Sequence, residues 1–254
     1  MTNILAIVRK EWRGYFSSPI GYVVIGMNAV VFGCFYALYL YWFTRQSMQG
    51  PQMGGGPMNI NLQLIRPVFD NSMVVALFVV PLITMRTYSE EKRSGTIELL
   101  MTSPVTDFQI MMGKFLGAMS LYGAMLGITL IHIGVLFAYG NPEWKPILTS
   151  YVGVILLGGS YVSIGLFFSS LTKNQIVAGM FTFAVLLLFL IVGWLGPFVG
   201  PTVERLTTYL SLTGHMDDFL RGVVDSQHVV YYLSFITFGL FLTAKAVDSE
   251  RWRG

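Results

Sequence analysis

Charged side chains are scarce in this sequence. Lys, Arg, Asp and Glu make up 11% of its 254 residues, whereas soluble domains average about 25%. A water-soluble protein of this length could not cover its surface with so few charges. Because 54% of the residues are hydrophobic, we expect lipid to surround much of the chain, where apolar side chains can face outward. The composition therefore excludes an ordinary soluble domain.

The sequence also lacks the features of several other classes. Its one cysteine, Cys34, lies in an apolar run and can form no internal disulfide. The net charge of +3 is small, and the basic residues gather at the ends of apolar runs, so we expect no nucleic-acid partner. The Walker pattern for ATP ends in Gly-Lys-Ser/Thr, but Gly113-Lys114 is followed by Phe115. We therefore expect a chain that is not an enzyme and binds no cofactor itself.

Long apolar runs predict an all-α integral membrane protein. About 20 apolar residues in an α-helix cross the ~30 Å core of a bilayer. Segment 2–17 alternates apolar and basic residues at helical spacing, which is typical of an amphipathic helix in the membrane interface. We predict one transmembrane domain, 1–254, with an interfacial helix at 2–17, a flexible loop at 44–67, short outer helices at 200–228, and spans at about 20–43, 68–86, 115–139, 147–171, 176–199 and 229–247.

The basic residues predict which side of the membrane each loop faces. Six spans put both termini on one side, and eleven of the 16 Lys and Arg residues fall on that side. The acidic residues divide almost evenly and contribute little. The positive-inside rule therefore predicts that the termini and the loops at 85–110 and 172–176 are cytoplasmic.

The densest charge lies between the second and third spans. A charged stretch ends at Gly95, and a short amphipathic stretch, 96–101, follows before Pro104. A short helix tied to two spans could transmit a push from a soluble partner, so we interpret 88–104 as a coupling segment. The alternative is a solvated loop whose charges only enforce the topology.

Two motifs resemble those of type-2 ABC exporter permeases. The first is the cytoplasmic coupling helix of that family, with the pattern Glu-x-x-x-Gly-Thr-x-Glu-x-Leu-x-x-x-Pro. The second joins the fourth and fifth spans over 165–178. A third segment, 215–225 followed by Tyr231-Tyr232, resembles the gliding-motility-type branch. The residues that carry the first two motifs are Glu91, Gly95, Thr96, Glu98, Leu100 and Pro104, then Gly165, Ser169, Thr172, Asn174 and Gln175.

The resemblance implies an architecture and a set of partners. It makes 2–17 the interfacial connecting helix and 200–228 a set of helices that dip into the outer leaflet. The chain would be half of a dimeric transmembrane unit in the inner membrane, surrounded by lipids and paired with an identical or paralogous permease. Two separate ABC ATPase subunits, which hold ATP and Mg, would dock near 88–104. The coupling residues would be Glu91, Gly95, Thr96, Glu98, Leu99, Leu100 and Pro104.

Two polar residues inside predicted spans are candidates for the pathway. His132 lies in the third span, where ionisable groups are often functional, but a neutral imidazole that forms a hydrogen bond to a neighbouring helix explains it better. Asn28, in the first span, is better explained as a hydrogen bond between helices. His132 with Gly158-Gly159-Ser160 suggests a Ser–His pair, but a packing surface of small residues explains the glycines better.

One outer segment contains candidate metal ligands. His215, Asp217 and Asp218 carry suitable donors. Three such residues on one short segment are a weak metal signal, and polar contacts with solvent or the interface explain them better. We therefore expect no metal site.

Two other function classes remain open from the sequence. An ion-gradient-driven carrier or channel would need ionisable groups near the membrane midplane, where this chain has little besides His132. A non-transporting regulatory or assembly subunit would have no substrate path. The substrate itself cannot be predicted.

Overall fold

The computed structural model describes residues 2–49, 59–97, 104–195 and 200–251. Within these ranges the chain is helical and contains no β-strand, which confirms the all-α prediction. The described residues include six helices that are long and apolar enough to cross a membrane. The long helices are α2 (Ile20–Gln49), α3 (Arg66–Thr84), α6 (Asp107–Tyr139), α7 (Trp144–Leu171), α8 (Gln175–Leu195) and α11 (Ser226–Arg251).

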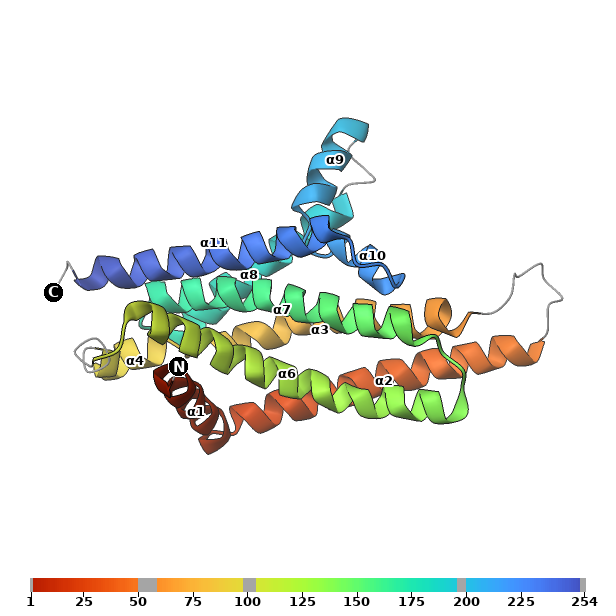
Figure 1. Ribbon diagram of the computed structural model, residues 1–254, viewed down its shortest axis with the longest axis horizontal. Coiled ribbons are helices and arrows are strands. Elements are labelled where there is room, and N and C mark those ends of the chain that lie inside the picture. Colours follow the sequence, from red (N-terminus) through yellow and green to blue (C-terminus); the bar gives the residue numbers. More distant parts are fainter. Residues whose placement is uncertain (1, 50–58, 98–103, 196–199, 252–254) are drawn as a thin grey trace.

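The long helices lie side by side along the longest dimension of the molecule (Figure 1). The shorter elements are α1 (Thr2–Ser17), the π-helical turn η1 (Asn61–Ile65), α4 (Ser89–Ser94), α9 (Pro201–Leu210), η3 (Gly214–Met216) and α10 (Asp217–Leu220). The start of α1, helix α4 and the end of α11 lie at the same end of the bundle, while α9 projects away from it (Figure 1). This arrangement agrees with an even number of crossings.

Helix α7 is the centre of the bundle and packs against α3, α6, α8 and α11. Its closest contacts occur at glycines. A Cβ added at Gly158 would overlap the ring of Tyr122, and one at Gly159 would lie 2.8 Å from Ile236 Cδ1. Small residues let membrane helices approach closely, so these glycines set the distance of α6 and α11 from α7.

The structure brings no Ser–His pair together at these glycines. The Ser160 hydroxyl donates to the Leu156 carbonyl of its own helix at 3.2 Å. His132 instead packs against Phe32 and Tyr36 of α2, with ring centroids 5.4 and 5.3 Å apart. The Gly158-Gly159-Ser160 segment is a packing surface, in agreement with the preferred interpretation.

Several helices extend beyond the spans predicted for them. Helix α2 continues to Gln49 and the second span begins at Asn61, inside the predicted loop at 44–67. Asn61 explains the earlier start, because its side-chain amide donates to the Glu143 carbonyl at 2.8 Å and its side-chain oxygen accepts from the Glu143 N–H at 3.1 Å. The helix of the third span begins at Asp107, ahead of the predicted span at 115–139, and Thr106 and Gln109 form a capping box at this start. The last span also starts earlier, at Ser226.

Residues 200–228 contain the short helices that the sequence predicted. The segment contains α9, η3 and α10, and hydrogen bonds to backbone carbonyls join α9 and α10 to the long helices. Tyr231 Oη donates to Leu210 O at 3.0 Å, and Thr149 Oγ1 donates to Phe219 O at 2.6 Å. This outer segment lies away from the bundle end that carries α4 (Figure 1).

Candidate functional site: a buried ion-pair network around α4

Helix α4 is a short element that the rest of the fold holds in place. Glu90 and Glu91 lie in its first turn and Lys92 and Arg93 in its last, an order that complements the helix dipole. It ends at Gly95, whose φ of 72° belongs to the left-handed region that glycine adopts without strain. Six residues are too few for a helix that is stable alone, so contacts with neighbouring helices must stabilise α4.

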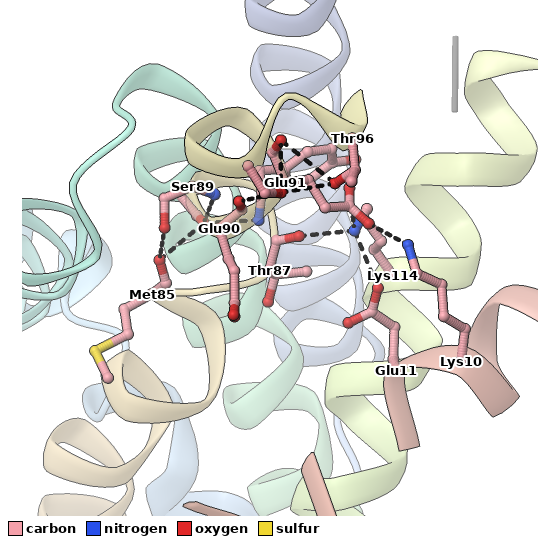
Figure 2. Close-up of polar contacts among 12 residues, drawn as sticks. Lys10, Glu11, Met85, Thr87, Ser89, Glu90, Glu91, Thr96 and Lys114 are labelled. Atoms are coloured by element: carbon pink, nitrogen blue, oxygen red, sulfur yellow. Dashed lines mark hydrogen bonds and ion pairs between the residues drawn. The ribbon is translucent and has the colours of Figure 1, made fainter. Parts of the chain in front are cut away.

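The strongest of these contacts surround Lys114 of α6, which is 0% exposed. Its ammonium nitrogen lies 3.0 Å from Glu11 Oε1 and 2.8 Å from Glu91 Oε2, and donates to the Thr87 carbonyl at 2.7 Å. Figure 2 shows these side chains converging from α1, α4 and α6. One buried cation thus connects three helices.

The network is balanced in charge. Lys10 of α1 pairs with Glu91 Oε1, so this carboxylate lies between two ammonium groups. Two lysines and two glutamates then neutralise one another. A buried charge is tolerated when it is paired and hydrogen-bonded, whereas loss of one partner leaves another charge uncompensated. The contacts therefore favour a single arrangement of α1, α4 and α6.

Helix α1 lies close against α6 because glycines face it. A Cβ added at Gly113 would lie 2.7 Å from Ile7 Cβ, and one at Gly117 would lie 2.8 Å from Glu11 Cβ. The Trp12 indole N–H also donates to Ser120 Oγ. A displacement of α4 would thus move α1 and α6 together.

On its other side, α4 is attached to the end of α7. Ser169 Oγ accepts from the N–H groups of Tyr88 at 3.0 Å and Ser89 at 3.2 Å, and donates to Met85 O at 3.2 Å. Lys92 Nζ donates to the Ser170 carbonyl. These bonds tie the chain between α3 and α4 to the fourth span.

The residues of the predicted motif between the fourth and fifth spans have two structural roles: Gly165 lies at a helix contact, and Thr172 and Asn174 form a turn. A Cβ added at Gly165 would overlap the Thr84 side chain, so Gly165 permits the crossing of α3 and α7. Thr172 Oγ1 accepts from Asn174 N at 3.1 Å, and Asn174 Oδ1 accepts from Ile176 N at 3.0 Å. Asn174 thereby satisfies an N–H at the start of α8, whose first residue is Gln175.

The structure places the predicted coupling residues differently. Glu91 is at the centre of the network, and Gly95 caps the end of α4. Thr96 follows this cap, and its Oγ1 donates to Glu91 O at 3.5 Å. Pro104 is exposed. The remaining three, Glu98, Leu99 and Leu100, lie outside the described residues.

Sequence reasoning missed three members of the network: Lys10, Glu11 and Lys114. Lys10 and Lys114 were counted only as cytoplasmic charges that set the topology. Two signals were available: Glu11 interrupts the basic face of 2–17, and Lys114 adjoins the apolar run predicted to begin at 115. Pairing them, however, required the fold, because 103 positions separate Glu11 from Lys114.

A polar groove of about 330 Å³ opens beside the network. Lys10 and Glu11 line it from α1, and Arg86, Glu90 and Glu91 line it from the opposite side. Arg86 pairs with Glu90 at 2.7 Å. The groove presents charges of both signs, which suits polar side chains of a soluble partner better than an apolar ligand.

Tyr15 also lines this groove from α1. Burial raises the pKa of the Tyr15 phenol well above its ordinary value, and the Glu11 carboxylate adds to the rise. The phenol therefore stays neutral across the physiological range. The charge of the groove is set by its Lys, Arg and Glu side chains.

The two candidate pathway residues take up different surroundings. Asn28 is buried and its side-chain amide donates to the Met125 carbonyl of α6 at 3.3 Å, which agrees with a hydrogen bond between helices. His132 lies among aromatic rings, and its buried Nδ1 has no hydrogen-bond partner among the described residues. The hydrogen bond to a neighbouring helix is therefore not seen at this nitrogen.

Comparison with known proteins extends these observations. The model of the family described as "ABC-2 family transporter protein" matches residues 68–214, more than half of the chain. The chain is 25% identical over 202 residues to "Probable multidrug ABC transporter permease YbhR" of Escherichia coli strain K12, over 74% of this chain and 54% of the relative. The same protein of Escherichia coli O157:H7 gives the same values. The chain thus spans about half the length of the curated relatives it matches.

Proposed function

Because this chain belongs to the ABC-2 family of transporter proteins, we propose that it is the permease subunit of an ATP-driven exporter. It pairs with an identical or paralogous permease to form the translocation pathway. Two separate ATPase subunits bind ATP and Mg²⁺ and supply the energy. The residues of 215–225 favour the gliding-motility-type branch of these permeases.

In this proposal the bundle end that carries α4 faces the cytoplasm, with both termini on that side of the inner membrane. Helix α1 lies in the membrane interface and the outer segment faces away from the cytoplasm. The excess of Lys and Arg at the α4 end supports this orientation. The groove between α1 and α4 then opens toward the compartment that contains ATP.

The ion-pair network explains how a local push could reach the pathway. An ATPase subunit that moves against 88–104 displaces α4. Glu91 passes that displacement to Lys114 of α6 and Lys10 of α1, while Ser169 and Ser170 pass it to α7. Since α1, α6 and α7 are joined to one short element, they shift together and do not absorb the motion separately.

The observation that carries the proposal is the fully buried Lys114 between Glu11 and Glu91. A loop whose charges only enforce topology would keep them in water, where they need no partners. Here a charged element between two spans is instead built into the helix bundle. That is what a part that transmits force requires.

Glu98, although outside the described residues, gives the sharpest functional test of the coupling segment. Glu98→Lys should lower ATP-dependent transport by about tenfold, within the usual range of coupling energies, while membrane insertion stays normal. Reconstituted vesicles containing permease and ATPase provide the assay. Fluorescent drug-like amphiphiles are suitable first cargoes because the relative is named "Probable multidrug ABC transporter permease YbhR".

The matched control is Glu143→Lys, which makes the same charge change at an exposed site on the opposite end of the bundle. It should transport like the unmodified protein. If Glu98→Lys docks the ATPase and transports normally, the assignment of 88–104 as the coupling segment is wrong. Transport that continues with no ATPase present would instead favour an ion-gradient-driven carrier.

A further inference from the structure

The outer segment and the start of α11 bring together side chains that the sequence did not group. The sequence placed Asp217 with His215 and Asp218 as candidate metal ligands. In the structure Asp217 instead pairs with Arg66 and Arg221. Asp218 is instead joined by Asp225 and His228. Each of these three residues offers one ligand atom, and the three atoms lie within 4.8 Å of one another.

His228 is oriented by a chain of hydrogen bonds that ends on the backbone. His215 Nε2 lies 3.0 Å from the Tyr209 carbonyl, and His215 Nδ1 lies 2.7 Å from His228 Nδ1. His215 is 5% exposed and stacks on the Tyr231 ring at 3.8 Å between centroids. These contacts fix both imidazole rings.

These hydrogen bonds also determine which ring nitrogens of His215 and His228 carry a hydrogen. A carbonyl only accepts, so His215 Nε2 donates to Tyr209. In the neutral form of both rings, His215 Nδ1 is then an acceptor and His228 Nδ1 donates to it. His228 is left with a lone pair on Nε2, which faces Asp218 Oδ2 at 2.8 Å.

When His228 is protonated, its Nε2–H donates to Asp218 and the two groups form an ion pair. When His228 is neutral, two acceptors face each other at this distance, and a metal cation can take the place of the proton. We propose that Asp218, Asp225 and His228 form a binding site for a divalent transition metal of the zinc class. An imidazole nitrogen with two carboxylates is a ligand set for Zn²⁺, whereas Mg²⁺ and Ca²⁺ prefer oxygen alone.

The surroundings of His228 match those of metal-binding histidines. Such a histidine almost always donates its other ring N–H to a fixed acceptor, which orients the ring; here His215 is that acceptor. The three ligands come from α10, from the turn after it and from α11. A bound ion would therefore fasten the outer segment to the last span. This inference does not depend on the proposed transport function.

The test is Zn²⁺ binding to the purified full-length chain in detergent, with any affinity tag removed and after treatment with a chelator. Titration calorimetry should give one ion per chain. Asp225→Asn is the most informative variant, because Asp225 is exposed and the asparagine oxygen can still accept from Gln227 N, as Asp225 Oδ1 does at 2.8 Å. It should weaken binding at least about tenfold, as should His228→Gln.

Asp248→Asn is the matched control, since it removes the same charge from the other end of α11, and it should bind Zn²⁺ like the unmodified protein. With Co²⁺ in place of Zn²⁺, a visible absorption band that is lost in His228→Gln would show nitrogen ligation. Absence of Zn²⁺ binding in the calorimetric titration of the unmodified chain would overturn the proposal. Equal affinity of Asp225→Asn and the unmodified chain would also overturn it.

Discussion

Lys114→Met will destabilise the folded protein by about 3–5 kcal/mol, because it leaves two glutamates without the buried cation between them. Glu11 and Glu91 both contact the Lys114 ammonium, and the methionine side chain has similar length but no charge. Thermal unfolding of the purified protein in detergent, followed by the loss of helical circular dichroism, measures the destabilisation.

Two further variants separate charge from packing. Lys145→Met makes the same change at an exposed position and should leave the unfolding temperature nearly unchanged. Lys114→Met combined with Glu11→Gln and Glu91→Gln removes the uncompensated charges and should recover much of the stability. If Lys114→Met unfolds like the unmodified protein, the buried network does not hold α1, α4 and α6 together.

Gly165→Ala is the second substitution with a large expected effect. Its new methyl group would overlap the Thr84 side chain where α3 crosses α7. Overpacking of this kind costs about 1–3 kcal/mol, and here it would also displace the helix that leads into α4. The same unfolding assay measures it.

A compensating substitution at Thr84 provides the control. Thr84→Gly removes the group that the methyl would strike, so the pair Gly165→Ala and Thr84→Gly should be more stable than Gly165→Ala alone. Gly127→Ala adds a methyl to a helical glycine with nothing within 4 Å, and should not destabilise. Equal stability of Gly165→Ala and Gly127→Ala would contradict the close crossing of α3 and α7.

The spans could be predicted from the sequence because hydrophobicity alone determines them. A run such as 176–199 must lie in lipid or in a core wherever the remaining chain goes. The ends of the helices were less predictable, since they depend on partners distant in the sequence. Asn61 starts the second span early because it bonds to Glu143, 82 positions away.

The sequence predicted some residues of the candidate site and missed others, and the difference has a physical reason. Glu91 and Gly95 belong to a local pattern, so a motif could identify them. Lys114 acquires its role only when α1 and α4 meet at α6, which no local pattern encodes. The outer cluster is similar: His228 lies ten positions after Asp218 and reaches it only because the chain turns back before α11.

The proposed coupling role requires α4 to be rigid relative to the spans, and its contacts supply that rigidity. Its six residues could not keep a helical shape in isolation. The bonds from Ser169 to two backbone N–H groups, and the ion pairs of Glu91, replace the stability that length would give. We expect force applied to 88–104 to move several spans, because the contacts of α4 prevent it from moving independently of them.

Cross-linking from single cysteines tests most directly whether α4 receives an ATPase subunit. In a chain with Cys34→Ser, the exposed positions Ser94 at the end of α4 and Val223 in the outer segment can each be changed to cysteine. With the cognate ATPase co-expressed, Ser94→Cys should form an adduct with it and Val223→Cys should not. An adduct from Val223→Cys, or none from Ser94→Cys in membranes that contain the ATPase, would contradict the account.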